Sequence, residues 1–289
     1  MTYLTTEEWN KYILPKLNDN ILFMEELKQI IGIKYILLDI IELLFQQNSN
    51  QSKKDSKSKL KKNLLYNSII YYYKYKLVSD SDFSENKKII CISCIYLAFK
   101  ESNHSIDLNW LSNKVEPYLN YQVPIKGKFQ IQDIHNKIKR IEFELLNSIQ
   151  FNIGIDNPYL FQKMIKLYLL KIEIENNIIE EAIDLINYYI DKSILFPLFL
   201  YYTNYEIALG SILLLKEDKK YNFINIDEII KLNKFQIDEN NIYQCSKYIC
   251  KICEVLKIKN LEINPQNWYH KNNENNLNFG SISCIEKNN

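Results

Sequence analysis

The most continuous apolar stretch of the chain lies within Lys87–Glu101, where every residue of Ile89–Phe99 except Ser93 is apolar. A helix with this pattern has no face suited to water, so we expect it at the centre of a helical bundle. The run is also shorter than the roughly 20 residues that cross a membrane. The polar residues Lys100 and Glu101 follow directly, which marks the point where this helix returns to the surface.

Apolar positions spaced three and four residues apart predict further helices on both sides of this central one. These helices start near Ile33, Leu65 and Leu108, and Asp82 or Ser84 can cap the central helix. The clearest face belongs to a fifth helix and consists of Ile134, Ile138, Ile141, Leu145 and Ile149. Glu142 lies at the edge of that face, where we expect its carboxylate to reach a partner without being buried.

Two segments of the first half lack a helical period. Residues 1–31 contain Pro15, which interrupts a helix, so we expect an N-terminal extension with one or two short helices. Residues 46–59 are polar, which predicts a disordered insertion. The six lysines between Lys53 and Lys62 fit either a nuclear import patch or a solvated loop, and we favour the loop.

The second half repeats the first. Its third helix, YEIALGSILLLKED, is again apolar all round and ends in Lys216 and Glu217. Its small residues Ala208, Gly210 and Ser211 are expected where helices approach closely. A repeat of about 110 residues is too long for a solenoid unit and fits a duplicated domain. We therefore predict an all-α fold with two tandem five-helix units, residues 32–155 and 156–258, and a C-terminal tail, residues 259–289.

Composition argues against several functions. The 36 Lys and Arg residues balance 35 Asp and Glu residues, which gives no general attraction for nucleic acid. The five glycines are scattered, so no glycine-rich loop is present to hold a phosphate. Without a nucleophile motif or an acid–base constellation, we expect no enzyme, no catalytic residue and no cofactor. The start of the chain lacks a secretory signal and no apolar run reaches membrane length, which predicts a cytosolic or nuclear protein.

Two local patterns have a functional and a structural interpretation. The pairs Cys91 with Cys94 and Cys250 with Cys253 have the spacing of zinc ligands, but both lie within apolar helical patterns, so we favour buried thiols and expect no metal. The tyrosines of residues 71–75 alternate with lysine and can stack on single-stranded nucleic acid. Helical spacing scatters these rings around the axis, which favours packing against neighbouring helices.

Two segments carry a family resemblance. CIYLAFKE, ending at Glu101, and IKRIEFELLNSIQFNIGIDNPY, ending at Tyr159, are similar to the third helix and to the fifth helix with its linker in the double cyclin box. The resemblance covers Ile33 to about Leu256. It implies a cyclin, which is a regulatory subunit that binds the C-helix of a cyclin-dependent kinase and activates that kinase. It also implies the kinase-binding residues, which are Lys100, Glu101, Glu142, Leu146, Phe151 and Ile153.

The resemblance is strongest to the transcription-type branch, cyclin H and cyclin C, on the DNPY sequence ending at Tyr159, on Tyr72–Lys74 and on Phe199–Ile212. This resemblance implies that the chain is the regulatory subunit of the CDK-activating kinase in transcription factor IIH. It also implies nuclear localisation (or also cytoplasmic) and allows a third assembly factor as a partner. The alternatives are another transcriptional cyclin (K, L or T type), a cell-cycle cyclin, and a DNA-binding protein of the transcription factor IIB kind. Ile33–Asp39 resembles the docking-groove helix of cell-cycle cyclins, although an amphipathic helix gives the same pattern, and we favour that interpretation.

Overall fold

The computed structural model describes residues 4–46, 54–78, 86–121, 123–124, 127–149, 151, 158–216, 219–233 and 238–258. The first half forms α1 (Thr6–Tyr12), α2 (Leu14–Asn18), α3 (Asn20–Phe45), α4 (Lys54–Val78), α5 (Lys87–Glu101), α6 (Leu108–Asn120) and α7 (Ile131–Ser148). The second half forms α8 (Phe161–Lys171), α9 (Asn176–Ser193), α10 (Asn204–Lys216), α11 (Ile226–Asn233) and α12 (Glu239–Ile258), with short 3-10 turns at η3 (Pro158–Leu160), η4 (Pro197–Leu200) and η5 (Lys219–Tyr221). These ranges contain no strand.

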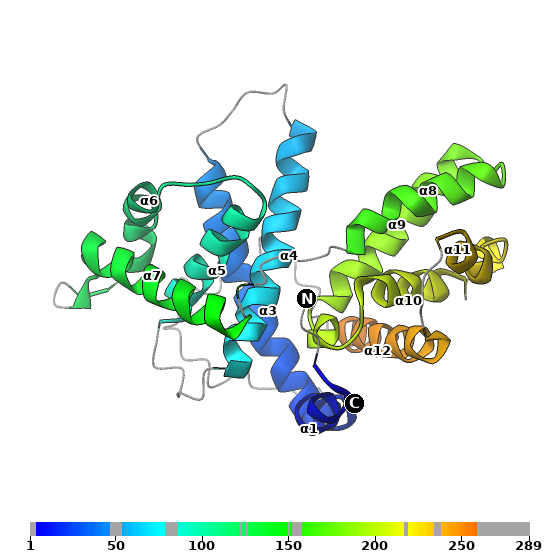
Figure 1. Ribbon diagram of the computed structural model, residues 1–289, viewed down its shortest axis with the longest axis horizontal. Coiled ribbons are helices and arrows are strands. Elements are labelled where there is room, and N and C mark those ends of the chain that lie inside the picture. Colours follow the sequence, from blue (N-terminus) through cyan, green and yellow to red (C-terminus); the bar gives the residue numbers. More distant parts are fainter. Residues whose placement is uncertain are drawn as a thin grey trace, which may run out of the picture.

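The helices form two groups of five, α3–α7 and α8–α12, which lie on opposite sides of Figure 1. In the first group α5 is the central helix, because every residue of Ile89–Phe99 is buried and α5 contacts α3, α4 and α7. Ser93 satisfies its hydroxyl within the helix by donating to the Ile89 carbonyl at 2.9 Å. The prediction of a helix without a solvent face is confirmed.

The cap of α5 differs from our expectation. The Asn86 side chain accepts a hydrogen bond from the Lys88 amide at 2.9 Å and caps the helix. We predicted Asp82 or Ser84 for this role, and both lie outside the described residues. Asn86 is one residue from the helix start, which is the position that can reach the free first-turn amides.

In the second group α10 is the central helix, and it packs closely against α12. A Cβ atom built on Gly210 would lie 3.2 Å from the Ser246 amide nitrogen and 3.4 Å from the Ile242 carbonyl oxygen. The absence of a side chain therefore lets two helix backbones approach each other. This confirms the expectation that small residues mark a close contact.

Two of the predicted segments are corrected by the structure. Helix α3 begins at Asn20, well before Ile33, because Asp19 caps it and Phe23, Leu27 and Ile30 continue its buried face. The predicted boundary between residues 31 and 32 therefore falls inside one continuous helix.

The prediction of a disordered insertion over residues 46–59 is wrong for its C-terminal part. Residues 54–59 are helical because α4 begins at Lys54, and residues 47–53 lie outside the described residues. Lys57 donates to the Phe45 carbonyl at 2.8 Å, and Lys61 pairs with Glu42 at 2.5 Å. These lysines lie on a helix that packs beside α3, so the loop interpretation was wrong for them.

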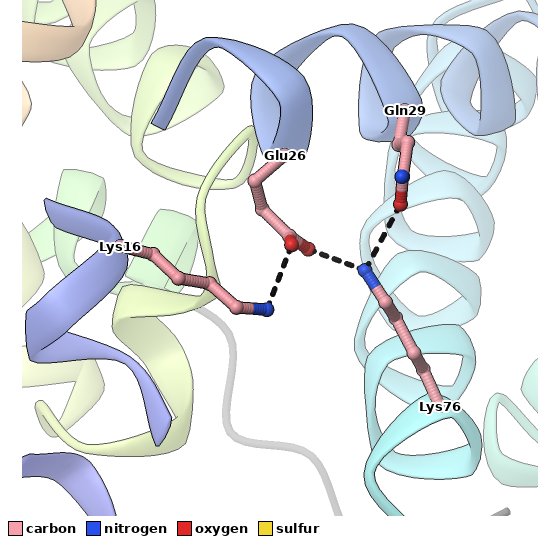
Figure 2. A network of polar contacts seen from close by, with 4 residues as sticks. All are labelled: Lys16, Glu26, Gln29 and Lys76. Carbon is pink, nitrogen blue, oxygen red and sulfur yellow. Dashed lines mark hydrogen bonds and ion pairs between the residues drawn. The ribbon is translucent and has the colours of Figure 1, made fainter. Parts of the chain in front are cut away.

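The N-terminal extension contacts both groups of helices. Trp9 of α1 is buried and stacks on Tyr201, with ring centroids 4.8 Å apart, and Lys251 of α12 donates to the Leu17 carbonyl. On the other side, Lys16 of α2 pairs with Glu26 of α3, which also pairs with Lys76 of α4 (Figure 2). The extension is therefore joined to both units of the fold.

Candidate protein-binding site

The end of α5 meets α7 through an ion pair between the two charged residues singled out in the sequence. Lys100 Nζ donates to Glu142 Oε1 at 2.6 Å. The Lys100 amine also lies 4.4 Å from the centroid of the Tyr96 ring, one helical turn earlier. Burial alone would lower the pKa of Lys100, but the Glu142 carboxylate and Tyr96 outweigh it and raise that pKa. The cation is thus held in one position at the surface.

The burial of Glu142 differs from our expectation. We expected an exposed carboxylate, but the side chain is only 10% exposed, whereas that of Lys100 is 41% exposed. The reason is that Glu142 faces α5 and is bonded to Lys100. The pair therefore presents mainly its cation to solvent, with the carboxylate behind it.

Glu101 points away from this pair. Its Oε2 accepts a hydrogen bond from Asn67 Nδ2 of α4, and Asn67 is itself buried. Lys100 and Glu101 therefore leave the end of α5 toward different helices, α7 and α4. The structure brings Lys100 together with Glu142 and places Glu101 beside them on the side of α4.

Large apolar side chains are exposed at the end of α7. Phe151 is 60% exposed, and its amide donates to the Leu146 carbonyl at 2.8 Å. Leu146 is partly buried and packs against the core. Phe151 has φ of 59°, a left-handed conformation that costs a residue with a side chain about 1–2 kcal/mol. Ile153 lies outside the described residues.

Phe143 belongs to the same surface, although sequence reasoning missed it. It is 61% exposed and precedes Leu146 by three positions, so the two side chains are neighbours on the helix. The sequence could have indicated this exposure, because Phe143 is an apolar residue that does not belong to the buried face with Ile138, Ile141 and Leu145. We call Phe143, Leu146 and Phe151 the apolar ledge.

The cysteines of α5 and the clustered tyrosines of α4 are buried. Cys91 and Cys94 lie fully inside α5, where burial raises the pKa of both thiols. In the ranges that the structure describes, no group of three or more metal-ligating side chains could hold a metal ion, and no helix is long and apolar enough to cross a membrane. Tyr71, Tyr72, Tyr73 and Tyr75 are buried, which confirms the packing interpretation of the tyrosine cluster.

Two solved structures have a similar fold. A chain of the yeast TFIIK complex (Kin28/Ccl1/Tfb3), determined by cryoEM, matches with a TM-score of 0.53 and 19% sequence identity, over 86% of this chain and 96% of that chain. A chain of the CAK complex of Chaetomium thermophilum bound to ATP-gamma-S matches with a TM-score of 0.52 and 11% identity, over 79% of this chain and 64% of that chain. Neither a protein-family model nor a curated protein sequence matches the chain.

These likenesses define the class of fold. The chain is all-α, with two tandem five-helix cyclin boxes preceded by an N-terminal helical extension, as the sequence predicted. At these identities the comparison concerns the fold, and it is consistent with the resemblance to cyclin H.

Proposed function

We propose that the chain is a cyclin, a non-catalytic regulatory subunit that binds and activates a cyclin-dependent serine/threonine kinase. The observation that carries the proposal is the Lys100–Glu142 pair beside the exposed apolar ledge. A fold similar to chains of the TFIIK and CAK complexes supports it. Glu101 and Ile153 are proposed as further contact residues on the family resemblance.

Activation requires energy that this surface can supply. A protein kinase is active when the glutamate of its C-helix pairs with the lysine that positions ATP. Moving a kinase from 1% to 99% in that state takes about 5.5 kcal/mol of preferential binding. Complete burial of an exposed phenylalanine is worth about 1.5–3 kcal/mol. Phe143 and Phe151 are each about 60% exposed, so covering both supplies about 2–4 kcal/mol before the entropy cost of association, and further contacts supply the rest.

Lys100 and Glu142 would set the register of the bound helix. Charge-assisted hydrogen bonds to the kinase backbone near its C-helix have a fixed geometry, which apolar contacts lack. The pair also joins α5 to α7 within the chain, where its contribution to stability is modest because the Lys100 amine is partly exposed to solvent. The two roles are compatible, because the intramolecular bond holds each side chain in position for the partner.

The more specific assignment is a cyclin H-like subunit of a CDK-activating kinase in transcription factor IIH. The sequence features at Tyr72–Lys74 and Phe199–Ile212 support this branch. The yeast complex with a similar chain contains three components, Kin28, Ccl1 and Tfb3, which supports a third assembly factor here. We accordingly propose a nuclear protein.

The experiment is affinity purification of the full chain from its source cells, with mass spectrometry of the bound proteins and a kinase assay on the isolated complex. We expect a cyclin-dependent kinase whose activity depends on the chain. Purification without a kinase, combined with a salt-dependent shift of promoter DNA, would favour the transcription factor IIB alternative.

A further inference from the structure

The turn of α7 that precedes Phe143 of the apolar ledge carries two exposed cations. Lys139 and Arg140 precede Phe143 by four and three positions, so both side chains are its neighbours on the surface of the helix. Lys139 is exposed, and the Arg140 side chain is 55% exposed. The ledge therefore has a positively charged border on the side toward the start of α7.

The carboxylates close to this border do not cancel its charge. Glu142 is paired with Lys100 and is 10% exposed, so its charge is already balanced from α5. Glu144 is 45% exposed, and its Oε1 lies 3.6 Å from Arg140 Nε. One half-exposed carboxylate thus faces two exposed cations, and the turn keeps an excess of positive charge that a negatively charged partner group would complement.

Arg140 is oriented by a contact that starts on α4. The Tyr75 hydroxyl donates to Glu144 Oε2 at 3.0 Å, while the other oxygen of that carboxylate faces Arg140. Tyr75 is 7% exposed, and burial together with Glu144 raises the pKa of its hydroxyl to about 12, so the hydroxyl remains a donor at neutral pH. Glu144 therefore links a buried tyrosine to the exposed guanidinium and restricts the positions that the guanidinium can adopt.

The chemistry of the guanidinium narrows the kind of partner group. Arg140 is the only arginine among the 36 basic residues of the chain. Ion pairs between helices are made by lysine, as in Lys16–Glu26 and Lys61–Glu42, so pairing within the chain does not require arginine. A guanidinium differs from an ammonium group because its planar fork can bind one carboxylate through two parallel hydrogen bonds.

We propose that the kinase segment covering the apolar ledge carries an Asp or Glu side chain that binds Arg140, with Lys139 beside it. This inference rests on the proposed function and adds the direction of the bound segment. Its acidic residue lies toward the start of α7, and its apolar residues lie over Phe143 and Leu146. A carboxylate fits better than a phosphate, because Glu144 would repel a group with two negative charges more strongly.

This contact would contribute to the choice of kinase. A kinase without an acidic residue at this place would cover two cations with apolar or positive groups, which weakens binding. The ledge alone does not discriminate in this way, because any apolar segment of suitable shape can cover it. The charged border therefore supplies selectivity that the apolar contacts lack.

The test compares the affinities of Arg140→Met, Arg140→Lys and the control Lys62→Met for the kinase found by affinity purification. We expect Arg140→Met to bind at least about tenfold more weakly than wild type. Arg140→Lys keeps the charge but loses the fork, so we expect it to bind at least about threefold more weakly. Lys62 is exposed on α4 in the same box, and Lys62→Met should bind like wild type. All three variants should melt at the wild-type temperature, because exposed cations contribute little to stability.

The outcomes separate this inference from the proposed function. If Arg140→Met binds as tightly as wild type, or no more weakly than Lys62→Met, the inference is wrong and the proposed function stands. If the wild-type chain binds no kinase, both fail.

A second measurement identifies the acidic residue. Each exposed Asp and Glu near the C-helix of the purified kinase is changed to Asn or Gln in turn. We expect one such change to weaken binding to the wild-type chain at least about tenfold and to have no further effect on binding to Arg140→Met. If no acidic residue behaves in this way, or if treating the kinase with a phosphatase removes the difference between wild type and Arg140→Met, the inference is overturned.

Discussion

Glu26 of α3 lies between Lys16 and Lys76, with one carboxylate oxygen 2.9 Å from Lys16 Nζ and the other 2.7 Å from Lys76 Nζ (Figure 2). The glutamate side chain is 8% exposed. Its burial favours the neutral acid, but the two ammonium groups outweigh this effect and hold the pKa of Glu26 below its ordinary value of 4.5. One buried carboxylate thus joins α2, α3 and α4.

The lowered pKa gives a pH dependence with a definite sign. Because Glu26 loses its proton more readily in the folded chain, its contribution to stability is complete above the ordinary pKa of 4.5 and is lost as the pH falls through the lower folded value. We expect Glu26→Gln to lower the free energy of unfolding by about 1–3 kcal/mol at pH 7, which is less than for a fully buried pair because the lysines reach solvent.

The measurement is urea unfolding of wild type and variant between pH 7 and pH 3. We expect the difference between them to shrink below pH 4.5. Glu25→Gln is the control, because Glu25 is the exposed neighbour on the same helix. Equal effects of the two variants would contradict the role of the network.

Trp9 tests whether the N-terminal extension is part of the folded unit. The residue is 3% exposed and contacts Tyr201 and Tyr202 from the second box. We expect Trp9→Ala to lower the free energy of unfolding by about 3–5 kcal/mol, as for other buried tryptophans. Trp110→Ala is the control, because Trp110 is 41% exposed and should have a smaller effect. An equal or smaller loss for Trp9→Ala in chemical denaturation would show that α1 does not stabilise the fold.

Sequence patterns correctly predicted the helices whose buried side follows from the spacing of their own apolar residues. The apolar run of α5 and the single face of α7 each determine which side of the helix is buried, and the structure agrees at Ile89–Phe99 and at Ile134, Ile138, Ile141 and Leu145. Helix ends were predicted less well. The start of α3 at Asn20 depends on the Asp19 cap and on packing of the first turns, which periodicity from Ile33 onward does not report.

The candidate site was predicted only in part, because sequence patterns do not report how the helices pack against one another. The resemblance singled out Lys100 and Glu142 as kinase-binding residues, and the structure joins the two in an ion pair. The burial of Glu142 and the direction of Glu101 depend on how α7 and α4 pack beside α5. Phe143 was detectable as an apolar residue off the buried face. The left-handed backbone of Phe151 has no signal in the sequence, because glycine is the residue that usually marks such a position.

The apolar ledge gives a prediction that separates binding from stability. Phe143 and Phe151 are each about 60% exposed, so Phe143→Asp and Phe151→Asp should change the free energy of unfolding by no more than about 0.5 kcal/mol. Each should abolish co-purification of the kinase, because a carboxylate would have to be buried against an apolar surface. The measurement pairs a thermal melt with kinase capture.

The control for the ledge is Tyr121→Asp. Tyr121 is 64% exposed at the end of α6 and is not part of the ledge, so kinase capture should persist. Loss of the cooperative melt in Phe143→Asp or Phe151→Asp would instead identify these residues as core. Phe151→Gly should stabilise the free chain by about 1 kcal/mol, because it removes the cost of the left-handed backbone, and should still weaken binding.

The central claim is that the Lys100–Glu142 pair and the ledge form the surface that activates a kinase. It is tested most directly by the activity of the purified kinase with wild-type chain, with Glu142→Ala and with Glu180→Ala, an exposed glutamate of α9. We expect Glu142→Ala to keep the fold, with a loss of about 1 kcal/mol or less, because Lys100 can be solvated. We expect it to need at least about tenfold more protein for half-maximal activation. Equal activation by Glu142→Ala and Glu180→Ala would contradict the account.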